Sequence, residues 1–140
     1  MKKIFLIALA MVLGSSAFAQ NDTITNEDAI YDQVWVLYRM NNKKVNYKEN
    51  DEKITLVITR ENEYAGGSSG CNRYFAQAVI KRNHLLFRSM GSTRMACPED
   101  KEELERTYLT AIDYVDSYKI IDEDLYLYKN DRAILVFEKE

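Results

Sequence analysis

Two cysteines, Cys71 and Cys97, carry the most reactive side chains of this 140-residue chain. In an exported protein they would pair as a disulfide, which would close a loop of about 27 residues and stabilise the fold by roughly 3–4 kcal/mol. The alternatives are two free thiols, a redox pair or half of a metal site. A redox pair is more typical as Cys-x-x-Cys, and zinc needs more ligands than these two thiols and the distant His84 provide. We therefore expect a structural disulfide, no metal site and no cofactor.

The glycine-rich segment 66–70 contains the pattern Gly-x-Ser-x-Gly, which holds the catalytic serine of α/β-hydrolases between a strand and a helix. Here a strand-like segment follows the glycines, and the only histidine, His84, lies in a polar turn with no acid between it and the serine. No lysine follows the last glycine, so the segment also lacks the phosphate-binding P-loop pattern. We interpret it as a bulge or sharp bend where another backbone comes close. We expect no catalytic residue and no enzymatic activity.

Two arginines lie close to the cysteines in the sequence, Arg73 just after Cys71 and Arg94 just before Cys97. A disulfide would bring these segments together, and two guanidinium groups could then clamp a carboxylate or a phosphate. The alternative is that each arginine pairs with an acid or a backbone carbonyl within the fold. The acidic run 122–124 lacks the ligand spacing of a calcium loop and predicts a turn.

Short apolar segments with period-two alternation predict the strands that must position these residues. β-Branched and aromatic residues dominate these segments, and short polar breaks with Asn and Asp between them favour hairpins. Strands joined by such short connections pair antiparallel, which predicts a meander of seven or eight strands. The predicted strands cover residues 34–38, 54–59, 74–80, 85–87, 118–121, 125–128 and 133–137.

One helix is predicted at residues 98–115, where Pro98 and several acids begin a stretch with apolar spacings of three and four. Its apolar stripe consists of Leu104, Tyr108, Ala111, Ile112 and Val115. The opposite, solvent-facing side is expected to hold Lys101, Glu105, Arg106 and Asp113. The predicted fold class is therefore mainly β (α+β), a compact antiparallel β-barrel-like meander with this helix packed on it.

The first residues have the three zones of a secretory signal peptide: two lysines, the apolar run 4–13 and small residues that end at Ala19. The apolar run is too short to cross about 30 Å of hydrocarbon, so we expect cleavage after residue 19 and no membrane span. No cysteine lies near the cut, so the product is not expected to be a lipoprotein. Residues 20–32 are polar and predict a flexible leader, followed by one domain at 33–140. The expected location is the periplasm or the medium.

The amino-acid composition and net charge of the chain indicate which classes of binding partner to expect. The chain is 46% hydrophobic and has 19 basic against 22 acidic residues, for a net charge of −3, which becomes −5 when residues 1–19 are removed. These values suit one soluble globular domain and provide no overall basic character for nucleic acid. The remaining candidates are an envelope protein or a small ligand.

Two motifs point to a known family. The segment Gly70-Cys71-Asn72-Arg73-Tyr74 is followed some twenty residues later by Ser92-Thr93-Arg94-Met95-Ala96-Cys97. Together with the strands before them and the helix after them, these motifs resemble the signature of the META domain family, which includes the heat-shock protein HslJ. The matching positions are Gly70, Cys71, Asn72, Arg73, Thr93, Met95 and Cys97.

The resemblance implies a compact β-barrel-like domain with one helix, usually exported or envelope-associated, in a family linked to heat-shock and envelope-stress phenotypes. No catalytic residues are established for the family, so the matching positions are expected to be structural, with Cys71 bridged to Cys97. Many relatives are lipoproteins, and this chain departs from them because it has no lipid-acceptor cysteine. The resulting hypothesis is a non-enzymatic, accessory or stress-related envelope domain. Alternatives are a small-ligand carrier at the barrel mouth near Arg73 and Arg94, or a module that binds a partner protein through an edge strand or the glycine-rich bend.

Overall fold

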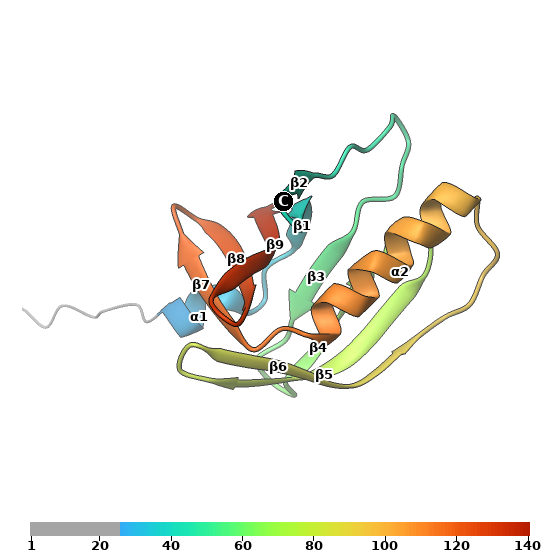
Figure 1. The fold of residues 1–140 in the computed structure, drawn as a ribbon. Helices are drawn as coiled ribbons and strands as arrows, with labels where there is room; N and C mark the ends of the chain where they lie inside the picture. The colour runs from blue at the N-terminus through green and yellow to red at the C-terminus, as the bar shows by residue number, and fades with distance from the viewer. Residues whose placement is uncertain (1–25) are drawn as a thin grey trace, which may run out of the picture.

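The computed structural model describes residues 26–140 as one antiparallel sheet that curves into a ring, with a long helix lying across it (Figure 1). The nine strands follow the order β2-β1-β3-β4-β5-β6-β7-β8-β9, and β1 also pairs with β9. The predicted mainly β, antiparallel fold with one main helix packed on the sheet is therefore confirmed. The elements are α1 (Asn26–Ile30), β1 (Trp35–Met40), β2 (Lys43–Lys44), β3 (Thr55–Ile58), β4 (Tyr64–Ser68), β5 (Arg73–Lys81), β6 (His84–Ser92), α2 (Glu99–Asp113), β7 (Ser117–Ile121), β8 (Asp124–Lys129) and β9 (Arg132–Lys139).

The folded domain begins before the predicted boundary at residue 33. The expected signal peptide and the first part of the expected leader lie outside the described residues. From Asn26 on, however, the chain forms the short helix α1, and Ile30 at its end is fully buried. The indole nitrogen of Trp35 donates a hydrogen bond to the carbonyl oxygen of Ile30 (3.0 Å). The last residues of the expected leader, although surrounded by polar neighbours, are thus part of the core.

Residues 66–68 of the glycine-rich segment belong to strand β4, and only residues 69–70 lie in the turn that follows. A Cβ atom at Gly67 would collide with the backbone of Thr55 on β3, so the expected close approach of another backbone is present. The sharp bend comes just after the strand, at Gly70, whose φ of +93° favours glycine. The strand β6 also runs further than predicted, to Ser92, and β2 was not predicted because it has only two residues.

Helix α2 closes the ring over a core of aromatic side chains. Tyr108 from α2 is fully buried and packs edge-to-face against Tyr74 of β5, with 5.4 Å between ring centroids, and against Phe137 of β9. The two tyrosine hydroxyls lie 2.6 Å apart, and Tyr74 donates to the carbonyl oxygen of Thr55 (2.9 Å). Burial raises the pKa of both tyrosines above 10.0, so their hydroxyls stay protonated and available as donors. The predicted apolar stripe of the helix therefore faces the core.

The seam between β6 and β7 is the weakest connection of the ring. These strands share a single paired position, His84 with Ser117, whereas β5 and β6 pair along most of their length. Helix α2 lies where the two strands separate and covers the opening (Figure 1). Within residues 26–140, no helix is long and apolar enough to cross a membrane. The remainder of β6 keeps one edge that pairs with no strand and runs beside α2.

Candidate functional site

The family-like motifs meet at the point where β5, the end of β6 and the start of α2 come together. Cys71, in the turn before β5, forms a disulfide with Cys97, just before α2, with 6.3 Å between the Cα atoms. The structure thus contains the expected disulfide. The bond ties the β4–β5 turn to the segment 93–98 that leads from β6 into the helix.

Asn72 is the centre of a buried hydrogen-bond cluster beside the disulfide. Its side chain is 3% exposed, and its amide nitrogen donates to the Glu105 carboxylate (2.9 Å) and to the carbonyl oxygen of Met95 (3.4 Å). Its amide oxygen accepts from the backbone N–H of Met95 (2.6 Å) and from the hydroxyl of Thr93 (3.1 Å). One amide side chain therefore holds both the β6–α2 loop and the helix.

Glu105 completes the cluster from helix α2. One of its carboxylate oxygens accepts from the backbone N–H of Asn72 (2.9 Å) and contacts the hydroxyl of Ser69, which also lies 2.7 Å from the carbonyl oxygen of Asn72. Gly70, with its positive φ, allows the chain to turn so that these donors face one point. The carboxylate thus receives three hydrogen bonds from the segment 69–72.

The expectation that Glu105 lies on the solvent face of the helix is wrong. Its carboxylate is turned toward the β4–β5 turn because three donors converge on it there. The helical period alone places Glu105 opposite the apolar stripe. No residue near Glu105 in the sequence indicates that its carboxylate accepts hydrogen bonds from the β4–β5 turn. The only available signal was indirect, since a buried Asn72 must find hydrogen-bond partners.

The remaining motif residues have distinct places. The hydroxyl of Thr93 accepts from the backbone N–H of Arg73 (3.1 Å), and Thr93 N–H donates to the carbonyl oxygen of Arg73 (2.9 Å). Met95 contributes its backbone to the cluster, while its side chain is 62% exposed. Arg94 lines a surface groove, whereas Arg73 exposes its side chain on β5 and does not line that groove. The backbones of the two arginines therefore lie near each other, but their side chains do not line the same groove.

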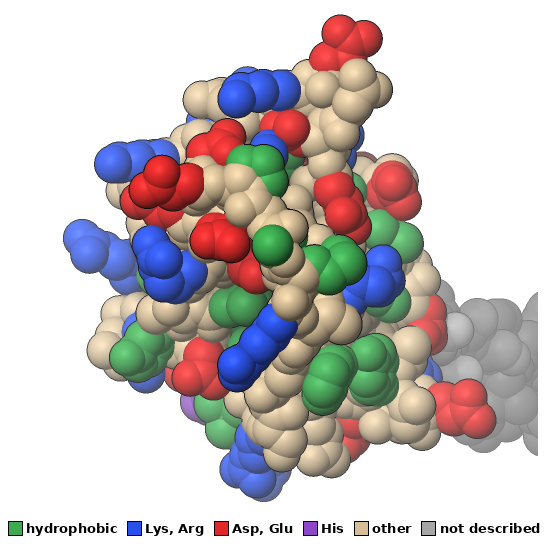
Figure 2. All heavy atoms as spheres, turned by 90° about the vertical axis from the view of Figure 1, so that its right-hand side faces the viewer, with side chains coloured by type: hydrophobic (Ala, Val, Ile, Leu, Met, Phe, Trp, Pro, Cys, Tyr) green, Lys and Arg blue, Asp and Glu red, His purple; other side chains and the backbone are tan. Residues whose placement is uncertain are grey.

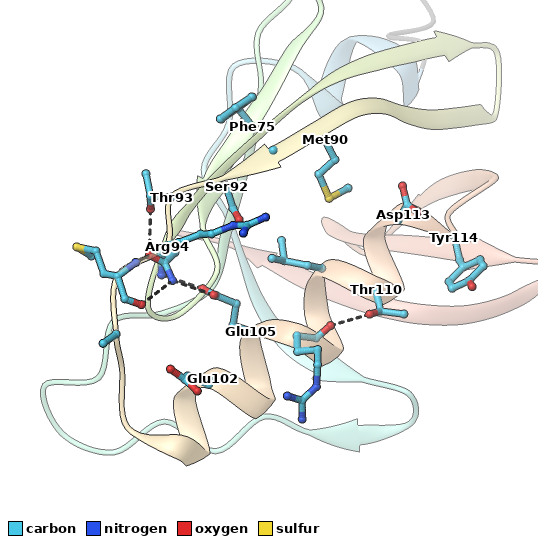
Figure 3. Close-up of a pocket in the computed structure, with 16 residues that line it drawn as sticks. Phe75, Met90, Ser92, Thr93, Arg94, Glu102, Glu105, Thr110, Asp113 and Tyr114 are labelled. Atoms are coloured by element: carbon cyan, nitrogen blue, oxygen red, sulfur yellow. Dashed lines mark hydrogen bonds between the residues drawn. The ribbon is translucent and has the colours of Figure 1, made fainter.

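The groove lies between α2 and the segment formed by the end of β6 and the loop after it (Figure 3). Its volume is about 1240 Å³. A bulge shapes one wall: Ser89 has a φ of +52°, and Ser89 and Met90 together oppose the single residue Ala76. After this bulge the Met90 side chain points toward α2. The other wall is the helix surface from Glu102 to Tyr114.

The rim of the groove exposes three large apolar side chains. Met95, Tyr114 and Phe75 are 62%, 58% and 47% exposed, and all three line it. Charged side chains of both signs stand between them, with Arg94 on the loop and Asp113 on the helix. Figure 2 shows hydrophobic side chains (green) reaching the surface among basic and acidic ones on the side that carries the start of α2. Such a lining can bury apolar groups and orient them through polar contacts at the edges.

Comparisons with known proteins agree with this architecture. A family model described as META domain matches residues 28–140. An NMR structure of a protein from Burkholderia xenovorans is similar over 100% of this chain and 98% of that chain, with 24% identity and a TM-score of 0.68. A second NMR structure covers 81% of this chain and 94% of its own, with 19% identity and a TM-score of 0.61. No curated protein matches. The two solved structures show the same fold.

Removal of the disulfide tests its structural role. We expect the Cys71→Ser/Cys97→Ser variant to lose about 3–4 kcal/mol of unfolding free energy, because the 26-residue separation leaves a long loop unconstrained in the unfolded chain. Urea denaturation of the oxidised wild type and of the variant measures this difference. The far-ultraviolet circular dichroism should stay the same, since Asn72 still holds the loop through hydrogen bonds. An equal midpoint for both proteins would contradict this role.

Proposed function

The chain belongs to the META domain family, and we propose that it is an exported, non-enzymatic member that binds an extended segment of an envelope protein. Its location would be the periplasm or the medium, without a lipid anchor, and its role there would be accessory or stress-related. The observation that carries the binding role is the groove between α2 and β6, whose rim exposes large apolar side chains. The family assignment supports the envelope context and leaves the partner to be found by the chemistry of the groove.

Export is supported by two independent features of the chain. Residues 1–19 have the charged, apolar and small-residue zones of a signal peptide. Cys71 and Cys97 pair across two separate segments, with 6.3 Å between their Cα atoms, and disulfide bonds persist in oxidising compartments. A lipid anchor would require a cysteine next to the cut, and the sequence there has none.

The dimensions of the groove favour a peptide over a compact ligand. The helix wall runs from Glu102 to Tyr114, which corresponds to a length of about 18 Å at ~1.5 Å per residue. An extended peptide of roughly five or six residues spans this length. The volume of about 1240 Å³ exceeds the roughly 300–1,000 Å³ that is typical of small-molecule pockets. An extended segment would fill the groove along its whole length.

The free edge of β6 provides the backbone partners that such a segment needs. Only His84 at the start of β6 pairs with β7, so the edge beyond it has no neighbouring strand. An incoming strand can use the N–H and C=O groups of such an edge, while its alternate side chains enter adjacent apolar sites. Met90, Leu109 and Met95 would offer those apolar sites, and Arg94 and Asp113 would select partners of mixed charge.

Export is tested by the N-terminus and the location of the protein made in its own host. We expect the intact mass of the exported protein to match a chain that begins at Gln20 and contains one disulfide, because cleavage follows Ala19. Cell fractionation should recover it in the periplasm or the medium. A chain that retains residues 1–19 and stays in the cytoplasm would contradict this part of the proposal.

The groove is tested by site-specific photo-crosslinking in the living cell. A benzophenone amino acid at Met95 or Tyr114 should capture one reproducible envelope protein, whereas the same group at Ile121, an exposed apolar residue outside the groove, should not. A synthetic peptide of the captured segment should bind the wild type at least about tenfold more tightly than Met95→Glu, since a buried charge replaces an apolar contact.

Complementation of a deletion strain tests whether binding in the groove is required for the proposed role in the envelope. A deletion strain should recover growth under heat stress with the wild type and with Ile121→Glu, and should not recover with Met95→Glu. Equal crosslinking at the groove and control positions would contradict peptide binding in the groove. Crosslinks at Met95 that yield only a small molecule would replace the peptide by the alternative small ligand.

A further inference from the structure

Positive charge is concentrated in one stretch of this acidic chain. Residues 64–98 contain five basic residues and no acidic residue, although the whole chain has 22 acidic and 19 basic residues. Acidic residues stand at both borders, Glu63 before β4 and Glu99 at the start of α2. The stretch forms β4, β5, β6 and the loop to α2, so the fold keeps these charges on one part of the surface. The basic residues are Arg73, Lys81, Arg82, Arg88 and Arg94.

The strand register places most of these charges on the outer face of the β5–β6 hairpin. Gln77 pairs with Arg88, and Lys81 pairs with His84, so each pair shares one face of the sheet. Along β5, exposed residues alternate with buried ones, which identifies this shared face as the outer one. We use the name basic face for the outward side chains of Tyr64, Arg73, Phe75, Lys81, Leu86 and Arg88.

Two aromatic rings are held firmly on the basic face by glycines beneath them. The ring of Phe75 lies over Gly91, with its Cε2 atom 2.7 Å from the point where a Cβ would stand. Tyr64 lies over Gly66 in the same way, at 3.0 Å from its Cε1 atom. Because each ring rests on backbone, both present a fixed apolar surface while remaining 47% and 46% exposed. Phe75 also reaches the rim of the groove, but in Figure 3 it lies on the opposite side of the hairpin from Met90, whose side chain points toward α2.

The five basic side chains between residues 64 and 98 form none of the ion pairs found among residues 26–140, so they can interact with a binding partner. Among residues 26–140, the ion pairs within 4.0 Å involve other basic residues: Lys48, Arg60, Lys101 and Lys129. None of the five cations between residues 64 and 98 takes part in them. Their long side chains can therefore reach a surface while their stems lie beside the apolar groups.

We propose that the basic face binds the surface of an anionic phospholipid bilayer. Each Lys or Arg near such a surface strengthens binding by roughly a factor of five, and tyrosine rings favour the headgroup level. An acidic protein is repelled by an anionic membrane unless its cations are gathered on one side, as they are here. The basic face is the outward side of a sheet, and a bilayer can bind such a surface without a groove. An extended protein segment would instead bind in the groove between β6 and α2. The residues that carry the test of this proposal, Lys81, Leu86 and Arg88, do not line that groove.

Vesicle sedimentation tests the proposal with the chain that begins at Gln20. The protein should bind vesicles of mixed phosphatidylglycerol and phosphatidylcholine, should bind pure phosphatidylcholine vesicles far more weakly, and should be released by salt. Lys81→Glu/Arg88→Glu should lower the partition constant at least about 25-fold. The control Lys43→Glu/Lys44→Glu, with the same change in net charge on exposed β2, should lower it much less.

A second pair of variants tests the apolar part of the basic face. Leu86→Ser should weaken partition roughly three- to tenfold, whereas Ile121→Ser, which is similarly exposed on β7, should leave it unchanged. Equal binding to both vesicle types, or equal losses in the two charge-reversal variants, would overturn the proposal. Binding of polyglutamate without binding of vesicles would also overturn it and would assign the basic face to an acidic protein segment.

Discussion

The contact between Asn72 and Glu105 is the interaction on which the rest of the site depends. An unpaired amide in this position would cost about 1–3 kcal/mol, so its burial requires the carboxylate and the β6–α2 loop to be in place. The structure meets this requirement completely: among residues 26–140, no buried side-chain nitrogen or oxygen lacks a hydrogen-bond partner. The turn, the loop and the helix are thereby fixed relative to one another by two polar side chains.

This constraint also explains the shape of the surface. Glu105 holds the first half of α2 against the β4–β5 turn, while Tyr108, three residues later, anchors the same helix in the core. The helix therefore crosses the opening between β6 and β7 without pairing with β6 as a strand would. The space left beside it is the groove, and the outer side of the β5–β6 hairpin remains uncovered. Because the contact between Asn72 and Glu105 fixes the position of α2, it determines both the shape of the proposed peptide groove and the exposure of the proposed membrane-binding face.

Much of the sheet could be predicted because its alternation is local. The pattern of β3 and the three-and-four spacing of α2 are each set by residues close in sequence. β4 was harder to predict because its glycines lower β propensity, and they are needed only because Thr55 lies against one and Tyr64 over another. The end of β6 lost its alternation at the bulge after Arg88, which shifts the period by one residue.

The polar cluster could not be predicted from local patterns. The spacing and neighbours of the cysteines suggested the disulfide and the family, but Glu105 lies 33 residues from Asn72 in the chain, and only the folded sheet brings them together. Helix α1 was not predicted either, because a helix of five residues is stable only when tertiary packing supports it. In both cases the determining contacts are tertiary.

A double-mutant cycle between Asn72 and Glu105 tests the central claim most directly. The unfolding free energies of Asn72→Ala, Glu105→Ala and the double variant, each with the disulfide intact, give the coupling between the two side chains. If the pair fixes the loop and helix, the double variant should lose about 1–3 kcal/mol less than the sum of the single losses. As a control, Asn72→Ala and Lys129→Ala should be additive within about 0.5 kcal/mol. Additive losses for Asn72 and Glu105 would contradict the account.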